Sequence, residues 1–416
     1  MARPEFVRFQ STDGPVAFHD TAQVVELLPE VFPHWPFYHE KQTTERPCLE
    51  VSRKEGKFLI ASPTMDRPKV ASNTLNAACT LLAELAWARI RHEPDLLCFH
   101  GAAIEFDGAL ALFPNKRRAG KSTLTACLSA KGHRVFTDDY LPLRSDHEGR
   151  MAGVANGAQP RLRLPIPEDF SSRLKQWLAQ HKGPSNRQYQ YLNLDTAQLA
   201  RHGESLPVAS IVLLDRTEQA TSPRLEPVET PEVLRRLIFQ NFSRSMNPAR
   251  ILAMICELAE SANCLCLTYS NAEEAAEYLT CKGTALGKEK KLQKKHRSLP
   301  EAKEAVFAVK KTRLQDTAYV QNPSVFLRRY GDDVFLATPD GPGMHHFDGV
   351  TNGIWGLLSE PVTQEDVCQV LSAAFPDEPR DQIAQAVRKT MQSMANYRLI
   401  SPLDDGSSDK GSQAMT

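Results

Sequence analysis

The stretch FPNKRRAGKSTL, residues 113–124, contains the second half of a phosphate-binding loop. The usual pattern of such a loop is G-x-x-x-x-G-K-[ST]. Residues 120–122 match its Gly-Lys-Ser end, but Asn115 occupies the first glycine position and three basic residues (116–118) fill the middle. The stretch therefore decides between a nucleotide-binding α/β unit and a basic turn.

Each residue type at the Gly-Lys-Ser end suits a phosphate. Glycine lets the phosphate approach the backbone, lysine supplies positive charge, and a serine hydroxyl can ligate Mg²⁺. A helix that begins here adds its N-terminal N–H groups and dipole. Asn115 lacks the freedom of glycine, but asparagine is among the residues that best tolerate a positive φ. The stretch favours nucleotide binding, while a decayed site or one that holds another anion stays open.

The segments around the loop have the order of a nucleotide-binding unit. LLCFHGAAIEF (96–106) and GALALFP (108–114) are expected to be strands joined at the Asp107-Gly108 turn. Residues 122–131 are expected to form a helix that Gly132 ends, and HRVFTDDYLPL (133–143) another strand. Strand, loop, helix and strand in this order predict an α/β fold.

Two aspartates follow the loop at the expected end of the next strand. Asp138 comes 16 residues after Ser122 (138 − 122), and Asp139 adjoins it. At the end of a parallel strand such side chains face the nucleotide crevice. One carboxylate can take a proton from an attacking hydroxyl and the other can bind Mg²⁺ or a cation. His100 precedes the loop; a lone histidine in a strand is otherwise a satisfied core or surface residue.

Residues 100–143 together resemble the kinase domain of the HPr kinase/phosphorylase family. The resemblance rests on His100-Gly101, the Asp107-Gly108 turn, the loop end, KGHR (131–134) and the aspartate pair. It implies an α/β P-loop kinase core that is PEP carboxykinase-like, with ATP and Mg²⁺ as cofactors. Beyond Leu143 the resemblance fades and does not place the family's second Mg²⁺ carboxylate, for which Asp215 is a weak candidate.

The resemblance also implies roles for individual residues. Asp138 would be the general base toward a serine-type hydroxyl, and Asp139 and His100 would support it. The implied catalytic residues are Asp138, Asp139, His100 and Lys121, and the implied metal ligands are Ser122 and Asp139. The implied nucleotide-binding residues are Asn115, Lys116, Arg117, Arg118, Ala119, Gly120, Lys121, Ser122 and Thr123.

Three further arginines carry charge but belong to no motif. Arg161 and Arg163, in QPRLRLP, have the charge to contact a phosphate or a peptide carboxylate, although loop arginines are more often solvated. Arg216 follows the apolar run IVLLD and is either a strand-end cation near the crevice or an exposed arginine.

The chain length and its composition breaks predict several domains. Residues 1–95 are expected to form a β-rich scaffold with one long helix, capped by Ser72 or Asn73, and residues 96–284 the nucleotide-binding domain. The basic run KEKKLQKKHR (288–297) marks a linker at 285–315, and 406–416 is expected to be a disordered tail.

Residues 316–405 are expected to form a compact, winged-helix-like unit. Hairpin strands are followed by three helical segments, one of which begins with the capping-box-like Thr363-x-x-Asp366. This segment resembles the PqqD family, in which a leader peptide adds as an extra strand to the sheet edge. The competing interpretation is a winged-helix nucleic-acid binder, but the cations of this segment are sparse and interleaved with acids.

The composition limits the partners. Lys+Arg 50 balances Asp+Glu 50, so no global field attracts nucleic acid or a membrane. Nine cysteines without a Cys-x-x-Cys pair suit a reducing cytoplasm. The N-terminus lacks an apolar signal segment, and we expect a cytoplasmic protein.

These patterns predict a kinase that phosphorylates a Ser/Thr-type hydroxyl on a peptide or small protein. The expected substrate is a precursor of a ribosomally made, modified peptide, captured by the PqqD-like unit. Two alternatives stay open. One is a non-catalytic nucleotide-sensing scaffold or regulator whose C-terminal unit binds a protein or DNA; the other is a small-molecule kinase. Whether the chain forms a homo-oligomer is also open.

Overall fold

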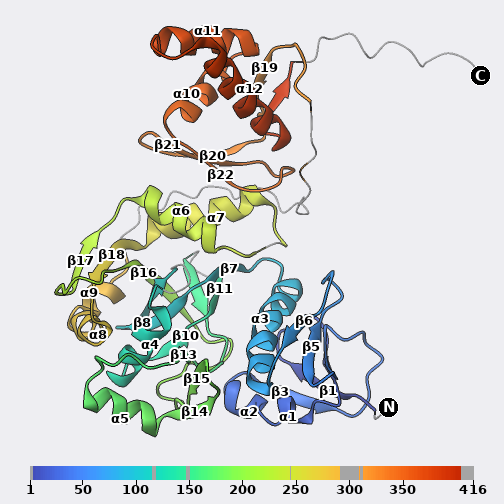
Figure 1. Cartoon of the computed structure of the whole chain (residues 1–416), viewed down its shortest axis with the longest axis vertical. Coiled ribbons are helices and arrows are strands. Elements are labelled where there is room, and N and C mark those ends of the chain that lie inside the picture. The colour runs from blue at the N-terminus through green and yellow to red at the C-terminus, as the bar shows by residue number, and fades with distance from the viewer. Residues whose placement is uncertain are drawn as a thin grey trace, which may run out of the picture. The chain divides into compact units, whose positions relative to one another are not determined.

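The computed structural model describes residues 3–114, 119–146, 150–243, 245–290, 309 and 313–403 (Figure 1). The chain divides into two compact units, Met1–Ser245 with Glu257–His296, and Met246–Cys256 with Arg297–Thr416. The predicted domain boundaries stay predictions, because much of the 285–315 linker and all of the 406–416 tail lie outside the described residues.

The first unit begins with a six-stranded sheet, as the β-rich N-terminal pattern indicates. Its strand order is β3-β1-β2-β4-β5-β6, and helix α3 (Thr74–His92) packs against it. Asn73 is the cap of α3, since its Oδ1 accepts a hydrogen bond from the Asn76 N–H at 2.9 Å. The elements are β1 (Glu5–Phe9), β2 (Val16–His19), α1 (Ala22–Val25), α2 (Leu28–Val31), β3 (Phe37–Glu40), β4 (Leu49–Lys54), β5 (Lys57–Ala61) and β6 (Lys69–Ala71).

A nine-stranded sheet forms the centre of this unit. Its main path is β10-β8-β9-β16-β12-β11-β7, and β18 pairs with both β16 and β17. The strands are β7 (Leu97–His100), β8 (Ala102–Phe106), β9 (Ala109–Phe113), β10 (Val135–Thr137), β11 (Tyr140–Ser145), β12 (Met151–Val154), β16 (Ser205–Arg216), β17 (Arg224–Pro227) and β18 (Asn263–Tyr269).

Four strands of this sheet run in the same direction. β16 is parallel to β9 and to β18. β8 is antiparallel to both β9 and β10, so β10 is parallel to β9. The carboxyl ends of β9, β10, β16 and β18 therefore meet at one edge of the sheet, which is where ligands bind in open α/β sheets.

Helix α4 contacts both α5 and α8, and the three helices share a core with the sheet (Figure 1). Leu124, Leu128, Leu174 and Leu279 are among the buried side chains of this core. The helix expected after the glycine loop is confirmed as α4. The helices are α4 (Lys121–Ala130), α5 (Ser172–Gln180), α6 (Thr230–Gln240), α7 (Pro248–Ser261), α8 (Ala272–Cys281) and α9 (Gly283–Gly287).

Two segments that were expected to be single strands are each broken. Residues 96–106 form β7 and β8, and residues 133–143 form β10 and β11. The breaks face each other, since the Gly101 N–H donates a hydrogen bond to the Asp139 carbonyl at 3.0 Å. A Cβ on Gly101 would lie 3.0 Å from the Phe113 carbonyl oxygen, so the chain needs glycine to change partners here.

Residues 153–170, which are rich in Gly and Pro, contain regular structure. The last residues of β12 fall within this stretch, and β13 (Arg161–Arg163) joins β15 (Tyr189–Leu192) and β14 (Lys182–Ser185) in a small antiparallel sheet. The Gly and Pro content of the stretch concealed these short strands, because each strand is only three or four residues long.

The second unit contains the expected hairpin strands and three helices. β20 (Phe326–Tyr330), β21 (Asp333–Ala337) and β22 (His345–Phe347) form an antiparallel sheet, and β19 (Tyr319–Gln321) pairs with β23 (Ile400–Pro402). The helices are α10 (Gly349–Leu357), α11 (Gln364–Ala374) and α12 (Arg380–Asn396). Trp355 and Val387 are buried in the core of this unit, and the capping box of Thr363 and Asp366 at the start of α11 is confirmed.

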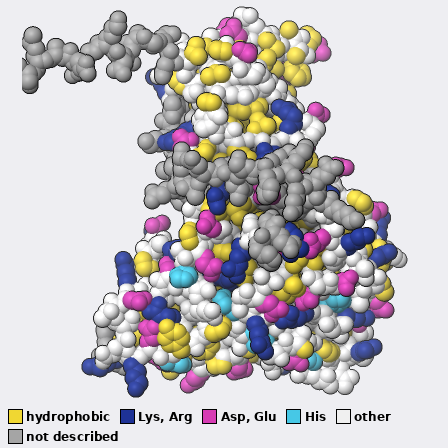
Figure 2. All heavy atoms as spheres, turned by 180° about the vertical axis from the view of Figure 1, so that it is seen from behind, with side chains coloured by type: hydrophobic (Ala, Val, Ile, Leu, Met, Phe, Trp, Pro, Cys, Tyr) yellow, Lys and Arg dark blue, Asp and Glu magenta, His cyan; other side chains and the backbone are white. Residues whose placement is uncertain are grey.

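Charges of both signs are interspersed over the N-terminal unit on the face shown in Figure 2, as the balanced composition leads one to expect. Within the described part of the chain, no helix has the length and the apolar content that crossing a bilayer demands.

Gly157 provides a test of backbone packing in the first unit. Its φ is +74°, and a Cβ there would lie 2.5 Å from the backbone carbonyl of His34. Gly56 also has a positive φ, of +75°, but a Cβ there meets nothing within 4 Å. We expect Gly157→Ala to lower the free energy of unfolding by more than about 2 kcal/mol, and Gly56→Ala by about 1 kcal/mol. Urea denaturation measures both; equal losses would contradict the backbone contact.

Candidate active site

The Gly-Lys-Ser end of the loop lies between strand β9 and helix α4. Gly120 caps the helix with φ +90°, a conformation that favours glycine. The Tyr269 hydroxyl donates a hydrogen bond to the Ala119 carbonyl at 3.3 Å and would lie 2.6 Å from a Cβ on Gly120. Glycine is therefore required here both by conformation and by the space that Tyr269 occupies.

The side chains that follow Gly120 point into different surroundings. Lys121, the first residue of α4, is buried, whereas Ser122 and Thr123 are half-buried. The N–H groups of the first turn of α4 and the helix dipole add a local positive potential. The other predicted nucleotide-binding residues, Asn115, Lys116, Arg117 and Arg118, lie outside the described residues.

Asp138 lies against the start of α4, at the carboxyl end of β10. Its carboxylate accepts a hydrogen bond at 2.9 Å from the Arg161 N–H, and the Ser122 side chain lies beside it. Burial, and then the charge of Asp139, raises the pKa of Asp138 to about 6, although Arg161 and Ser122 oppose the shift. The fold thus brings together the serine and the aspartate that the sequence singled out.

Asp139 lies between His100 and Arg161. His100 Nδ1 is 3.4 Å from one of its carboxylate oxygens, and Arg161 Nη2 is 4.0 Å from the other. The pairing of β7 with β11 places Tyr140 opposite His100 and so sets the distance from His100 to Asp139. The four predicted catalytic residues, Asp138, Asp139, His100 and Lys121, therefore come from elements that meet at one edge of the sheet.

Arg161 makes three contacts in the site, although its sequence context was typical of a solvated loop arginine. Its backbone N–H holds Asp138, its guanidinium faces Asp139, and its Cζ lies 4.8 Å from the centre of the Tyr189 ring. Arg163 lies farther from the same ring, at 5.7 Å, and is exposed. The alternation of the QPRLRLP stretch was a signal for β13, and it would have placed both arginines on one face.

Two other residues lie at this edge: Arg216, to which the sequence assigned no definite role, and Tyr269, which was not identified from the sequence. Arg216 lies beside the loop, since a Cβ on Gly120 would be 3.9 Å from its Cδ. Tyr269 belongs to no nucleotide motif, and its contact with Ala119 depends on β18 lying next to β16. Its position at the end of an apolar strand, in line with Arg216 at the end of β16, was the available signal.

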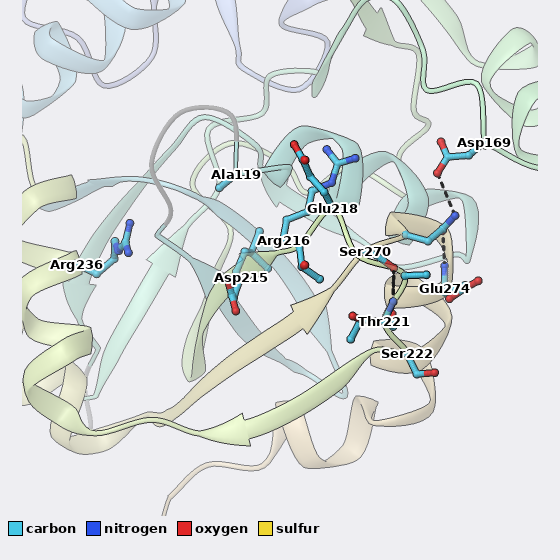
Figure 3. A pocket seen from close by; sticks show the side chains of 14 residues that line it. Ala119, Asp169, Asp215, Arg216, Glu218, Thr221, Ser222, Arg236, Ser270 and Glu274 are labelled. Atoms are coloured by element: carbon cyan, nitrogen blue, oxygen red, sulfur yellow. Dashed lines mark hydrogen bonds between the residues drawn. The ribbon is translucent and has the colours of Figure 1, made fainter.

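A cleft of about 1100 Å³ opens beside Ala119 at the ends of β16 and β18 (Figure 3). Arg216 and Glu218 extend toward Ala119, whereas Asp215 points away from them. Thr221 and Ser270 hold two sides of the cleft together, because the Thr221 N–H donates to the Ser270 Oγ at 3.0 Å. The cleft thus continues from the glycine turn along the edge where the parallel strands end.

The groups at this edge fit a magnesium-bound nucleotide. Mg²⁺ prefers hard oxygen ligands and usually takes one or two from the protein, together with phosphate and water. Ser122 and the aspartate pair supply such oxygens, and buried Lys121 supplies positive charge. No group of three or more His, Cys, Asp or Glu side chains suited to a metal occurs among the described residues, so a metal would need phosphate oxygens to complete its shell.

Comparison with known proteins identifies the C-terminal domain. Residues 333–400 match the family described as Coenzyme PQQ synthesis protein D (PqqD), so the second unit contains a PqqD domain, as its sequence predicted. No curated protein matches the chain.

One solved structure shows a weak likeness to part of this chain. The Hpr(Ser) kinase/phosphatase from Coxiella burnetii aligns over 45% of this chain and 96% of its own, with 13% sequence identity and a TM-score of 0.24. The match is to the family that the sequence resembles, but a likeness this weak supports no argument about the site. The chemistry of the site is therefore argued from the contacts of this chain alone.

Asp138 provides a test of the electrostatics of the site. Because its folded pKa of about 6 lies above the ordinary 3.8, the folded state loses stability as the pH rises from about 4 through 6. Asparagine does not ionise. In the presence of a chelator at pH 8, the free energy of unfolding of Asp138→Asn should therefore be about 1–3 kcal/mol higher than that of the wild type. Denaturant titrations at pH 4 and pH 8 measure the difference.

The expected gain is present at pH 8 and absent at pH 4. Asp107→Asn makes the same chemical change at the exposed turn between β8 and β9 and controls for loss of a carboxylate as such. A gain that does not depend on pH would show that desolvation of Asp138 is not its cause.

Proposed function

We propose that this chain is a Mg²⁺- and ATP-dependent kinase that phosphorylates a Ser/Thr-type hydroxyl on a peptide held by its PqqD domain. The observation that supports this most is that Ser122 lies beside the buried Asp138. A candidate metal-binding hydroxyl and a candidate base are therefore neighbours at the N-terminus of α4.

Asp138 is suited to remove the proton of an acceptor hydroxyl. Its pKa of about 6 leaves it ionised at neutral pH yet more basic than an ordinary aspartate, and a base near the operating pH is the most effective. A bound Mg²⁺–ATP would supply the phosphoryl group and part of the charge neutralisation. Lys121 would add positive charge beside the phosphates.

Arg161 and His100 would position the carboxylates rather than react. The Arg161 N–H fixes one oxygen of Asp138, which leaves the other oriented by Ser122 and the acceptor. His100 and the Arg161 guanidinium lie on the two oxygens of Asp139 and restrict its rotation. Such restriction matters because phosphoryl transfer depends chiefly on positioning and charge neutralisation.

The PqqD domain would bring the acceptor peptide. PqqD domains bind precursor peptides, and an added peptide strand needs an open sheet edge. Within the described residues, β22 pairs with β21 alone, and His345 on β22 lies 4.3 Å, ring to ring, from Tyr397 at the end of α12. A peptide tethered at this edge would reach the kinase site at a raised effective concentration.

Transfer of label from γ-labelled ATP to the precursor peptides encoded beside the gene tests the proposal. We expect Asp138→Asn to lower kcat by about 10²–10⁴-fold with little change in ATP affinity, because only the base is lost. Lys121→Ala should weaken ATP binding. Removal of the leader from the peptide should raise KM more than it lowers kcat.

Asp107→Asn, at an exposed turn of the same unit, is the matched control and should retain full activity. ATP binding without label transfer to any peptide would favour a nucleotide-sensing regulator instead. Equal phosphorylation of peptides with and without leader would separate the kinase from the PqqD domain.

A further inference from the structure

The cleft beside Ala119 lies on the opposite side of the glycine turn from Asp138. Strand β9, which leads into the turn, has β8 and then β10 on one side, and β16 and then β18 on the other. Asp138 follows β10, whereas the cleft is formed by the ends of β16 and β18, the loop after β16 and the start of α8. The turn thus separates the acidic pair from the cleft.

This arrangement gives a bound triphosphate a direction. Its reactive end has to lie at Ser122 and Asp138, where the acceptor hydroxyl loses its proton. The phosphate chain would pass Gly120, which has no side chain of its own and has the Tyr269 hydroxyl beside it. Its remaining part then emerges on the β16 side, next to Arg216, whose Cδ lies 3.9 Å from the position of a Cβ on Gly120.

We infer that the cleft is the nucleoside pocket, in which the sugar and the base lie beyond Arg216; this inference rests on the proposed function. The volume of about 1100 Å³ is ample, since small-molecule sites span about 300–1,000 Å³. Arg216 extends toward Ala119 and is placed to contact the phosphates nearest the sugar (Figure 3). Glu218 on the same side is an acceptor for sugar hydroxyls.

The lining residues also indicate how selective the cleft is for the nucleotide base. Leu214 is the one large apolar side chain among the described lining residues, and none of them is aromatic. The charged ones are four carboxylates and two arginines: Asp169, Asp215, Glu218, Glu274, Arg216 and Arg236. A base therefore gains little stacking here, and the pocket discriminates weakly between adenine and guanine.

Binding of Mg²⁺–ATP and of Mg²⁺–tripolyphosphate to the full chain separates the nucleoside from the phosphates. The wild type should bind ATP more tightly than tripolyphosphate, and GTP within about tenfold of ATP. Ala220→Trp fills the cleft from its exposed loop and should weaken ATP by about tenfold or more without changing tripolyphosphate binding. Ser222→Trp, at another exposed lining position, should do the same.

Gln219→Trp is the matched control, because Gln219 is exposed in the same loop but does not line the cleft. It should leave both ligands unaffected. Equal weakening of both ligands by Ala220→Trp, or no weakening of ATP by either lining variant, would overturn the nucleoside pocket while leaving the kinase site intact. If the wild type binds neither ligand, the proposed function fails along with the pocket.

Discussion

The parallel course of β9, β10, β16 and β18 is the constraint on which the site depends. Because these strands run in one direction, the segments that follow them meet at one edge of the sheet. The proximity of Ser122 and Asp138 is the local consequence, and it brings the first turn of α4 next to the segment after β10. The Tyr269 hydroxyl on Ala119 is a second one, and it joins the turn to a strand that comes much later in the chain.

Ionisation of Asp138 connects the stability of this edge with its chemistry. A carboxylate held in a desolvated place costs folding free energy above its pKa, and that same desolvation makes it a better proton acceptor. Arg161, through its charge and its N–H, and the neighbouring Ser122 limit the cost without removing it. A buried carboxylate with a raised pKa lowers the stability of the fold. Such groups are more typical of functional sites than of carboxylates with a purely structural role.

The sequence was sufficient for the local elements and for part of the site. The Gly-Lys-Ser end, the hairpin turn at Asp107 and the aspartate pair each depend on neighbouring residues, and each has a clear residue signature. The breaks after His100 and at Asp138 could not be read from apolar runs, because periodicity does not show where a strand changes partners. The position of Tyr269 depends on which strands pair, and a single sequence does not encode that locally.

The two domains complement each other chemically. The PqqD domain has an edge strand, β22, and the first unit has a buried aspartate and a cleft where its parallel strands end. In the proposed function, the edge strand would hold an extended peptide and the aspartate would act as the base. Because the positive and negative charges of the chain balance, its overall electrostatic field does not attract nucleic acid. Recognition of an acceptor would then depend on main-chain hydrogen bonds at β22, which give affinity, and on nearby side chains, which give specificity.

A crystal structure of the full chain with Mg²⁺ and a non-hydrolysable ATP analogue tests the central claim most directly. The account predicts a metal ion in contact with the Ser122 hydroxyl, phosphates over Gly120, and the terminal phosphate facing Asp138. Phosphates bound away from the start of α4, or a terminal phosphate that faces away from Asp138, would contradict it.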